Sequence, residues 1–214
     1  MPSRLRPPRR LPSSRKLPTP RARTLVLAAA ASAGLTVVVA APAFSHGYTN
    51  TPVSRALFCK QGTVKDCGEV KYEPQSVEGP KGFPKSGPRD GTICAAGDSR
   101  WAPLDDPRGG QWPATSLTGG QSYTFAWTLT AAHSTASFRY FVTKDGWDYK
   151  RPVTRAALDL TPFLRLDYGN KQPPRDFSHS GTLPVRHGRH LIVAVWDIAD
   201  TGNAFYQCSD VDFG

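Results

Sequence analysis

The clearest structural pattern in the chain lies in "SYTFAWTLTAAHSTASFRYFVTK", residues 122–144. In its first half, every second residue from Tyr123 to Leu129 is aromatic or aliphatic, which is the period of a half-buried β-strand. Its second half, "ASFRYFVTK", is again rich in aromatic and β-branched residues. We therefore expect two strands joined by a turn, and the turn carries His133.

Two later segments have the same character, "RHLIVAVWDIA" at 189–199 and "AFYQCSDVDF" at 204–213. By contrast, the region from His46 to about Ser122 is rich in Gly, Pro and polar residues without a sustained period. We expect an ordered loop region with short helical turns there, inserted after the first strand. Because no ten-residue helical pattern separates the strands, the sequence predicts an all-β, antiparallel sandwich.

Residues 1–45 have the composition of an export signal. They contain eight Lys and Arg and no acidic residue, then the apolar run "LVLAAAASAGLTVVVA" at 25–40, then "APAFS". The small residues Ala43 and Ser45 predict cleavage between Ser45 and His46. The apolar run is shorter than the roughly 20 residues that a membrane-spanning helix needs, so we expect a removed signal peptide. Arg9-Arg10 is a poor twin-arginine match, which leaves the export route open.

Cleavage at that point leaves residues 46–214 as a single secreted domain. This part has 19 basic and 17 acidic residues, a formal charge of +2, against +10 for the whole chain. The basic charge belongs to the leader, so nucleic-acid binding loses its main support. We expect no membrane contact of the mature form, and a monomer.

All four cysteines fall in the mature part. An even number in an exported chain predicts two disulfides, with three possible connectivities. Cys59 and Cys67 close a short loop, so we expect them to pair and to leave Cys94 with Cys208. Zinc binding is the competing interpretation, and no C-x-x-C spacing supports it.

Histidine chemistry gives the functional hypothesis; the five candidates are His46, His133, His179, His187 and His190. Cleavage before His46 would create an α-amine, so that this residue offers its amine and its Nδ1 in one chelate ring. One further imidazole would complete a tetragonal set of three nitrogens, which favours copper. His133 is the preferred partner because a turn between two strands holds it. The pair His187 and His190 is the alternative.

Five blocks extend this hypothesis: "HGYTNTPVSRALFC", "VKYEPQSVEGPKGFPKSGPRDG", "TAAHSTASFRYFVTKDGWD", "TRAALDLTPF" and "LIVAVWDIADTGNAFYQ". In order and approximate spacing they resemble the bacterial lytic polysaccharide monooxygenases of auxiliary activity family ten, first described as chitin-binding proteins. The resemblance spans nearly all of residues 46–214. It implies a fibronectin-III- or immunoglobulin-like sandwich that holds one copper in a histidine brace of His46 and His133.

The resemblance also implies roles for single residues. Phe205 matches the aromatic residue at the copper's axial position, Ala131 the small residue beside the metal, and Glu78 an acid that orients the oxygen co-substrate. Tyr72 matches an exposed aromatic residue that stacks on a sugar ring. The remaining matches to the substrate-binding surface are Glu73, Pro74, Ser76, Asp200 and Asn203.

Strand period supports one part of this match: if 204–210 is extended, Phe205 and Gln207 share a face while Tyr206 and Cys208 point the other way. One departure concerns a second disulfide of some relatives, whose positions hold Leu164 and Gly181 here.

The implied activity is oxidative cleavage of crystalline chitin with oxidation at C1. It requires an external electron donor and hydrogen peroxide or dioxygen. Cellulose-active or dual-specificity cleavage is the first alternative. A non-catalytic chitin-binding module and a copper carrier are the others.

Overall fold

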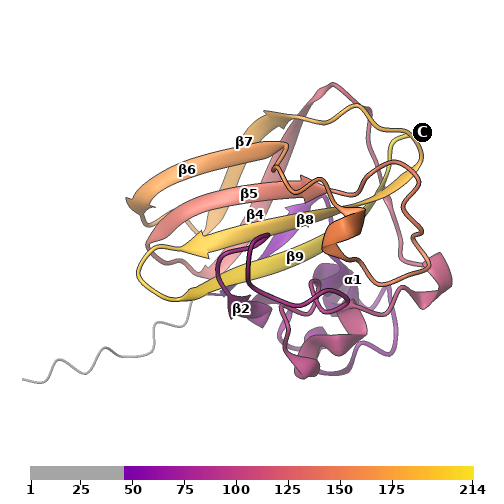
Figure 1. The fold of residues 1–214 in the computed structure, drawn as a ribbon. Coiled ribbons are helices and arrows are strands. Elements are labelled where there is room, and N and C mark those ends of the chain that lie inside the picture. The colour runs from indigo at the N-terminus through magenta and orange to yellow at the C-terminus, as the bar shows by residue number, and fades with distance from the viewer. Residues whose placement is uncertain (1–45) are drawn as a thin grey trace, which may run out of the picture. The chain divides into compact units, whose positions relative to one another are not determined.

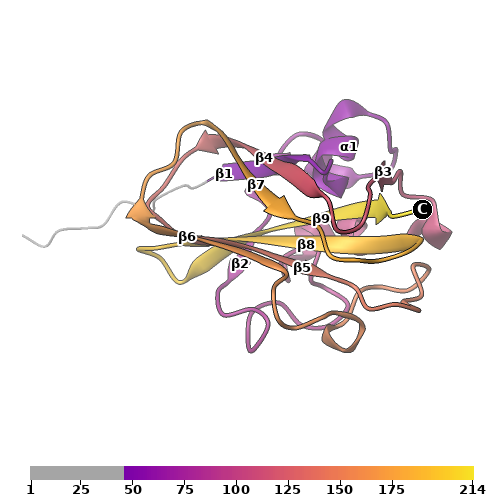
Figure 2. The same cartoon turned by 90° about the horizontal axis from the view of Figure 1, so that it is seen from above.

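The computed structural model describes residues 46–214, and the expected signal peptide at 1–45 lies outside them. Two sheets face each other, as Figures 1 and 2 show from two sides. The smaller has the order β1 (His46–Thr51), β4 (Ser122–Ala131) and β7 (Asp176–Thr182). The larger has the order β2 (Glu78–Pro80), β9 (Asn203–Asp212), β8 (Arg189–Ile198), β5 (Thr135–Val142) and β6 (Leu164–Lys171).

Neighbouring strands along both sheets are antiparallel; the short β3 (Thr115–Ser116) pairs with β9 in parallel. The predicted all-β sandwich is therefore confirmed. The sequence located β4, β5, β8 and β9 to within about a residue or two. It missed β6 and β7, which bury few of their side chains; the short alternation of Leu164, Leu166 and Tyr168 in β6 was overlooked.

The region between β1 and β4 is the expected insertion of loops and short helices. Its helices are α1 (Arg55–Gln61), η1 (Gly68–Lys71), η2 (Pro74–Ser76), η3 (Ser99–Leu104) and η4 (Arg108–Gly110); η5 (Arg155–Ala157) follows β5. Ser54 caps α1 by accepting a hydrogen bond from the Leu57 amide at 3.2 Å. Gly62 ends the helix in the left-handed conformation, at φ 72°. Within residues 46–214, no helix is long and apolar enough to cross a membrane.

One hydrophobic core fills the space between the sheets. The expected alternation along β4 is confirmed, since Phe125, Trp127 and Leu129 are buried against aromatic residues of β5 and β8. The Trp196 ring stacks on Phe138 with centroids 6.0 Å apart and planes inclined by 7°. This aromatic packing gives the sandwich a rigid core that can hold side chains at its edge in fixed positions.

A second core lies on the other face of the larger sheet, where the insertion covers it. As the strand period predicted, Phe205 enters the first core, whereas Tyr206 and Cys208 enter the second. The structure contains the two expected disulfides, Cys59–Cys67 within the insertion and Cys94–Cys208 between the insertion and β9.

A buried ion pair adds a further link between the insertion and the sheet. The guanidinium of Arg55 in α1 contacts the carboxylate of Asp210 in β9 at 2.7 Å, and both side chains are at most 5% exposed. The same guanidinium donates to the Leu104 carbonyl at 2.8 Å. The insertion is thus cross-linked to the larger sheet at two places.

The departure at Leu164 and Gly181 has a simple packing explanation. A side chain at Gly181 would place its Cβ 2.4 Å from Leu164 Cδ2, so the leucine occupies the space beside the glycine. Leu164 belongs to the partly buried rim of the sandwich core. An apolar contact of Leu164 with the glycine therefore fills this position.

Candidate functional site

Strand register brings His46 to the turn that carries His133. His46 begins β1, and its partner in β4 is Ala131, the last residue of that strand. The turn 132–134 follows at once and leads into β5. Ala131, which the resemblance places beside the metal, lies opposite His46 in this register.

Gly47 allows this edge to pack closely. A Cβ at this position would lie 2.7 Å from Leu129 Cδ2 and 3.1 Å from the Trp196 ring. Only glycine permits β1 to lie so near both side chains. A larger residue at this position would force either the Leu129 side chain or the start of β1, which carries His46, to shift.

Hydrogen bonds fix the backbone of the His133 turn from several sides. Each of its three carbonyl groups accepts one, from Gln172 Nε2 to Ala132 at 3.0 Å, from Thr135 Oγ1 to His133 at 2.9 Å and from Ala199 N to Ser134 at 2.7 Å. The Thr135 hydroxyl also accepts a bond from the indole Nε1 of Trp196 at 2.8 Å. The turn is therefore tied to the buried aromatic core and is held in one conformation.

The imidazole of His133 is mostly enclosed, with its side chain 19% exposed. The Asp200 carboxylate lies 2.9 Å from Nδ1, but out of line with the ring N–H, so this buried nitrogen has no hydrogen bond. A carboxylate beside one ring nitrogen is the common arrangement around a metal-binding histidine, because it orients the ring and leaves the other nitrogen to the metal. The ring is thus in a suitable setting for a ligand.

The short strand β2 brings Glu78 to the same edge. Glu78 pairs with Phe205 of β9, so the insertion places a carboxylate directly opposite this aromatic residue. Phe205 is fully buried and packs on Trp196 at 5.0 Å between centroids. Phe205 therefore places a buried apolar ring, without a donor atom, on the strand that pairs with Glu78.

A cavity of about 280 Å³ contains His46 and Glu78, whereas His133 and Phe205 are not among its lining residues. Its lining residues are His46, Glu73, Ser76, Glu78, Arg100 and Asn203. Five of the six were expected from the sequence. Arg100 was missed, because it lies in η3 within a stretch that has no motif or period.

Arg100 gives the cavity a positive charge beside two carboxylates. It is anchored to Asp98 at 2.7 Å and lies over the Trp101 ring at 4.9 Å. The hydrogen bond from Arg100 lowers the pKa of the Asp98 carboxyl below its ordinary value. Asp98 stays charged and holds the guanidinium near the cavity.

The expected substrate-binding residues lie at this edge with one exception. Tyr72 is 75% exposed, and the Lys71 ammonium lies 5.5 Å from its ring centroid. Asp200 and Asn203 are also exposed. Pro74 corrects the expectation of a surface position: it is buried at the start of η2, where its fixed φ suits the first helical position.

The alternative metal pair is less suitable. His190 is buried, and its two ring nitrogens contact the Thr143 hydroxyl at 2.9 Å and the His187 carbonyl at 3.2 Å. Burial lowers its pKa. Since protein groups already engage both nitrogens, His190 has none to offer, and His187 alone is an exposed histidine.

Other metal arrangements find no support between residues 46 and 214. All four cysteines are in disulfides, which removes the zinc alternative. The described residues contain no group of three or more His, Cys, Asp and Glu side chains arranged as a metal site. A metal at this edge would have to rely on two imidazoles and a backbone amine.

Comparisons with known proteins agree with this geometry. A family described as "Lytic polysaccharide mono-oxygenase, cellulose-degrading" matches residues 46–211. An AA10 family lytic polysaccharide monooxygenase C of Mycosarcoma maydis is 47% identical over 79% of this chain and 53% of its own length. GlcNAc-binding protein A of Shewanella oneidensis is 43% identical over 86% of this chain and 38% of its own. The chain thus spans about half or less of these curated relatives.

Solved structures show the same likeness. An AA10 lytic polysaccharide monooxygenase from Streptomyces lividans is 58% identical with a TM-score of 0.77, covering 78% of this chain and all of its own. A Bacillus amyloliquefaciens CBM33 protein in complex with Cu(I) is 36% identical with a TM-score of 0.72, covering 78% of this chain and 99% of its own. The chain belongs to the lytic polysaccharide monooxygenases of family AA10.

Proposed function

We propose that the mature chain is a copper-dependent monooxygenase that cleaves crystalline chitin with oxidation at C1, using an external electron donor and hydrogen peroxide or dioxygen. The proposal rests on how the strands bring four residues to one edge of the domain. His46 and Glu78 line one cavity, Phe205 pairs with Glu78, and the turn that carries His133 adjoins the start of β1. Family membership provides the reaction class.

The residues present fit a single copper ion. After cleavage, His46 would contribute its α-amine and Nδ1, and His133 would contribute Nε2, because Asp200 lies beside its Nδ1. The similar structure of the Bacillus amyloliquefaciens CBM33 protein, which is in complex with Cu(I), supports copper as the metal. When bound, copper would supply the one-electron redox chemistry that activates the oxygen co-substrate.

The side chains around that position divide the remaining work. Glu78 would orient the co-substrate by hydrogen bonding and hold or release a proton at its carboxylate. Phe205 would exclude water and other ligands from the inner side of the site. The negative charge of Asp200 beside Nδ1 of His133 would favour a proton on that nitrogen and leave Nε2 to the metal.

The exposed groups around the cavity suit a polysaccharide surface. Tyr72 presents an aromatic ring for stacking on a sugar, while Glu73, Ser76 and Asn203 offer hydrogen-bonding groups near it. Arg100 adds a cationic donor. Pro74 is left out of this set because it is buried, and its role is to shape η2.

Chitin is the preferred substrate because "YEPQSVEG" resembles the chitin-active subgroup, and because the Shewanella relative is named for binding GlcNAc. Cellulose is the second candidate, and it is favoured by the match to a family described as cellulose-degrading. We propose secretion after removal of residues 1–45, since only a free amine at His46 completes the copper site.

Incubation with the two polysaccharides tests the proposal. The exported, copper-loaded protein would be mixed with β-chitin or cellulose and ascorbate, and the soluble products identified by mass spectrometry. We expect aldonic acids of chito-oligosaccharides. Oxidised products from cellulose alone would overturn the choice of chitin, and binding to chitin without any oxidised product would leave a binding module.

A matched pair of variants assigns the activity to the site. Glu78→Gln should lower the rate of product release about 100-fold while copper binding is retained. Glu69→Gln changes an exposed acid of η1 outside the cavity and should leave the rate unchanged. Equal rates for Glu78→Gln and the unmodified protein would exclude a catalytic role for this carboxylate.

A further inference from the structure

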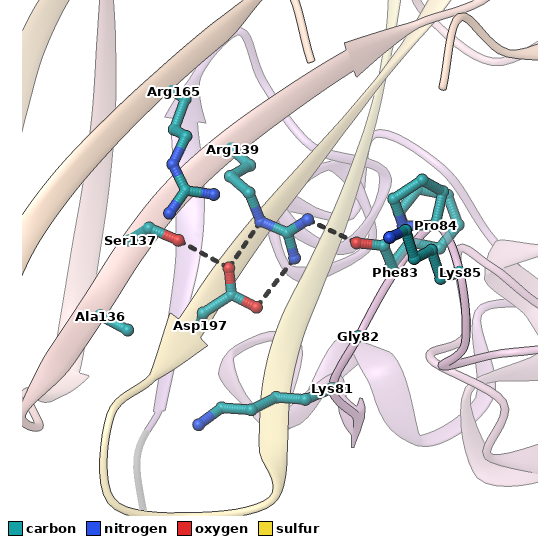
Figure 3. A pocket seen from close by; sticks show the side chains of 10 residues that line it. All are labelled: Lys81, Gly82, Phe83, Pro84, Lys85, Ala136, Ser137, Arg139, Arg165 and Asp197. Carbon is teal, nitrogen blue, oxygen red and sulfur yellow. Dashed lines mark hydrogen bonds and ion pairs between the residues drawn. The ribbon is translucent and has the colours of Figure 1, made fainter. Parts of the chain in front are cut away.

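A second cavity, of about 470 Å³, opens where β2 ends, and Figure 3 shows the side chains that line it. Its volume lies within the range of small-molecule sites, roughly 300–1,000 Å³. Lys81 begins this region, three residues after Glu78, and its amide donates to the Gly202 carbonyl at 2.9 Å. The cavity therefore adjoins the edge that carries the copper candidate.

Its floor is a preorganised polar network. The Asp197 carboxylate accepts bonds from Arg139 Nε at 2.7 Å, Arg139 Nη2 at 2.9 Å and Ser137 Oγ at 2.8 Å (Figure 3). Arg139 also donates to the Phe83 carbonyl at the opposite wall. Both side chains of the ion pair are only 11% exposed, so Arg139 neutralises the carboxylate of Asp197 and both are fixed.

The remaining charge of the cavity is positive. The lining contains Lys81, Lys85 and Arg165 besides the neutralised pair, and no further acid. Arg165 bonds to Asp167 outside the lining. Within residues 46–214, the ammonium groups of Lys81 and Lys85 have no carboxylate partner within 4 Å; Lys81 donates to the Thr201 carbonyl.

The geometry points to a binding site for a carboxylate anion about the size of a sugar acid. Figure 3 shows Arg139 and Arg165, each already paired with an aspartate, on one side of Asp197 and Lys81 on the other, so the ammonium groups of Lys81 and Lys85 carry the unpaired positive charge. A basic depression on the surface attracts anions, and ammonium donors make strong, charge-assisted bonds to carboxylates. The Ser137 hydroxyl donates to Asp197 and can still accept a hydrogen bond from a ligand hydroxyl.

Two sources could supply this ligand. One is the aldonic acid at the end of a chain cut at C1; this source rests on the proposed function, and the cavity adjoins the face where such an end would form. The other is a free organic acid from solution. The shared chemistry is a carboxylate, and binding measurements separate the two.

Calorimetric titration of the mature, copper-loaded protein tests the site with chitobionic acid, neutral chitobiose and citrate as separate probes. We expect chitobionic acid to bind, more weakly as NaCl is raised, and chitobiose to show no comparable lysine-dependent binding. The double variant Lys81→Gln/Lys85→Gln should weaken the acid at least about tenfold. The matched control Lys65→Gln/Lys150→Gln removes two exposed lysines outside the lining and should leave affinity unchanged.

Lys85→Glu is a second variant. Because residue 85 is exposed, this variant should fold normally, and replacing a positive charge of the cavity with a negative one should lower the affinity for chitobionic acid. Citrate that binds as well as chitobionic acid, with the same dependence on the lysines, would support the anion site and overturn the sugar-acid source. An acid affinity that is equal in all variants would overturn the site itself. The titration uses added ligands and measures no product of catalysis, so its result does not depend on whether the proposed activity is correct.

Discussion

The two hydrophobic cores of this domain are built in different ways. The sandwich core between the sheets follows the alternation of β4, β5, β8 and β9, and aromatic rings pack there layer on layer. The insertion core packs α1, short 3₁₀ helices and loops against the outer face of the larger sheet, to which disulfide Cys94–Cys208 and the Arg55–Asp210 pair fasten them. Regular hydrogen bonding stabilises the first region, and cross-links stabilise the second.

The candidate site lies where the two regions meet. His46, His133 and Phe205 belong to the sandwich, whereas Glu73, Ser76, Glu78 and Arg100 belong to the insertion. The sandwich therefore holds the candidate metal ligands in fixed positions. The insertion supplies the groups that meet oxygen and substrate, and loops on a rigid frame are where such functions commonly reside.

Removing Cys94–Cys208 should produce the largest change, because it frees the insertion from the sheet. Its sequence separation is 114 residues, for which loop entropy predicts a loss of about 5 kcal/mol in the free energy of unfolding. The separation for Cys59–Cys67 is 8 residues, and its loss should cost about 2.5 kcal/mol. Urea unfolding of the two Cys→Ala pairs measures the difference, and equal losses would contradict the comparison.

Arg55→Ala should cost about 3–5 kcal/mol, because it leaves the Asp210 carboxylate buried without its main partner. Arg100→Ala is the matched control: its pair with Asp98 is exposed, and such pairs contribute about 1 kcal/mol or less. Thermal unfolding of both variants checks the prediction. A loss below 1 kcal/mol for Arg55→Ala would mean that this cross-link does not hold the insertion.

His133→Ala should lower copper affinity by more than about 100-fold, since even partners of metal ligands contribute about 10–100-fold. The same variant should lose much less free energy of unfolding than free energy of copper binding, because hydrogen bonds to main-chain carbonyls hold the turn without the imidazole. His187→Ala should leave copper affinity unchanged. Competition with a chelator measures both variants, and the reverse pattern would move the metal to the His187 and His190 segment.

Asp105 provides a pH test of the insertion. Burial raises the pKa of its carboxyl to about 6, although the amides of Cys94 and Ala95 donate to it. A raised pKa means that the folded state binds the proton more tightly, so this group's contribution falls as pH rises from about 4 to about 6. Asp105→Asn should remove that dependence and stabilise the protein at pH 7 by on the order of 2 kcal/mol.

Unfolding curves for this variant and the unmodified protein between pH 4 and pH 7 provide the measurement. The stability difference in favour of Asp105→Asn should grow through this window. A constant difference would show that Asp105 titrates normally in the folded state.

The sequence predicts the sandwich better than it predicts the insertion. Alternation along β4 and β9 assigned Trp127, Phe205 and Cys208 to their faces, because strand period alone decides this. The resemblance named Glu78, which no period could have found. Arg100 was missed and Pro74 was misplaced, because residues in short 3₁₀ helices owe their exposure to distant contacts rather than to a local pattern.

The most direct test of the central claim is the copper affinity of two purified forms, one that begins at His46 and one that retains Ser45. The account predicts that the first binds one copper per chain, and that the second, whose His46 nitrogen is an amide, binds it at least 100-fold more weakly. Equal affinities would show that the α-amine is not a ligand, and would contradict a copper site built on His46 and His133.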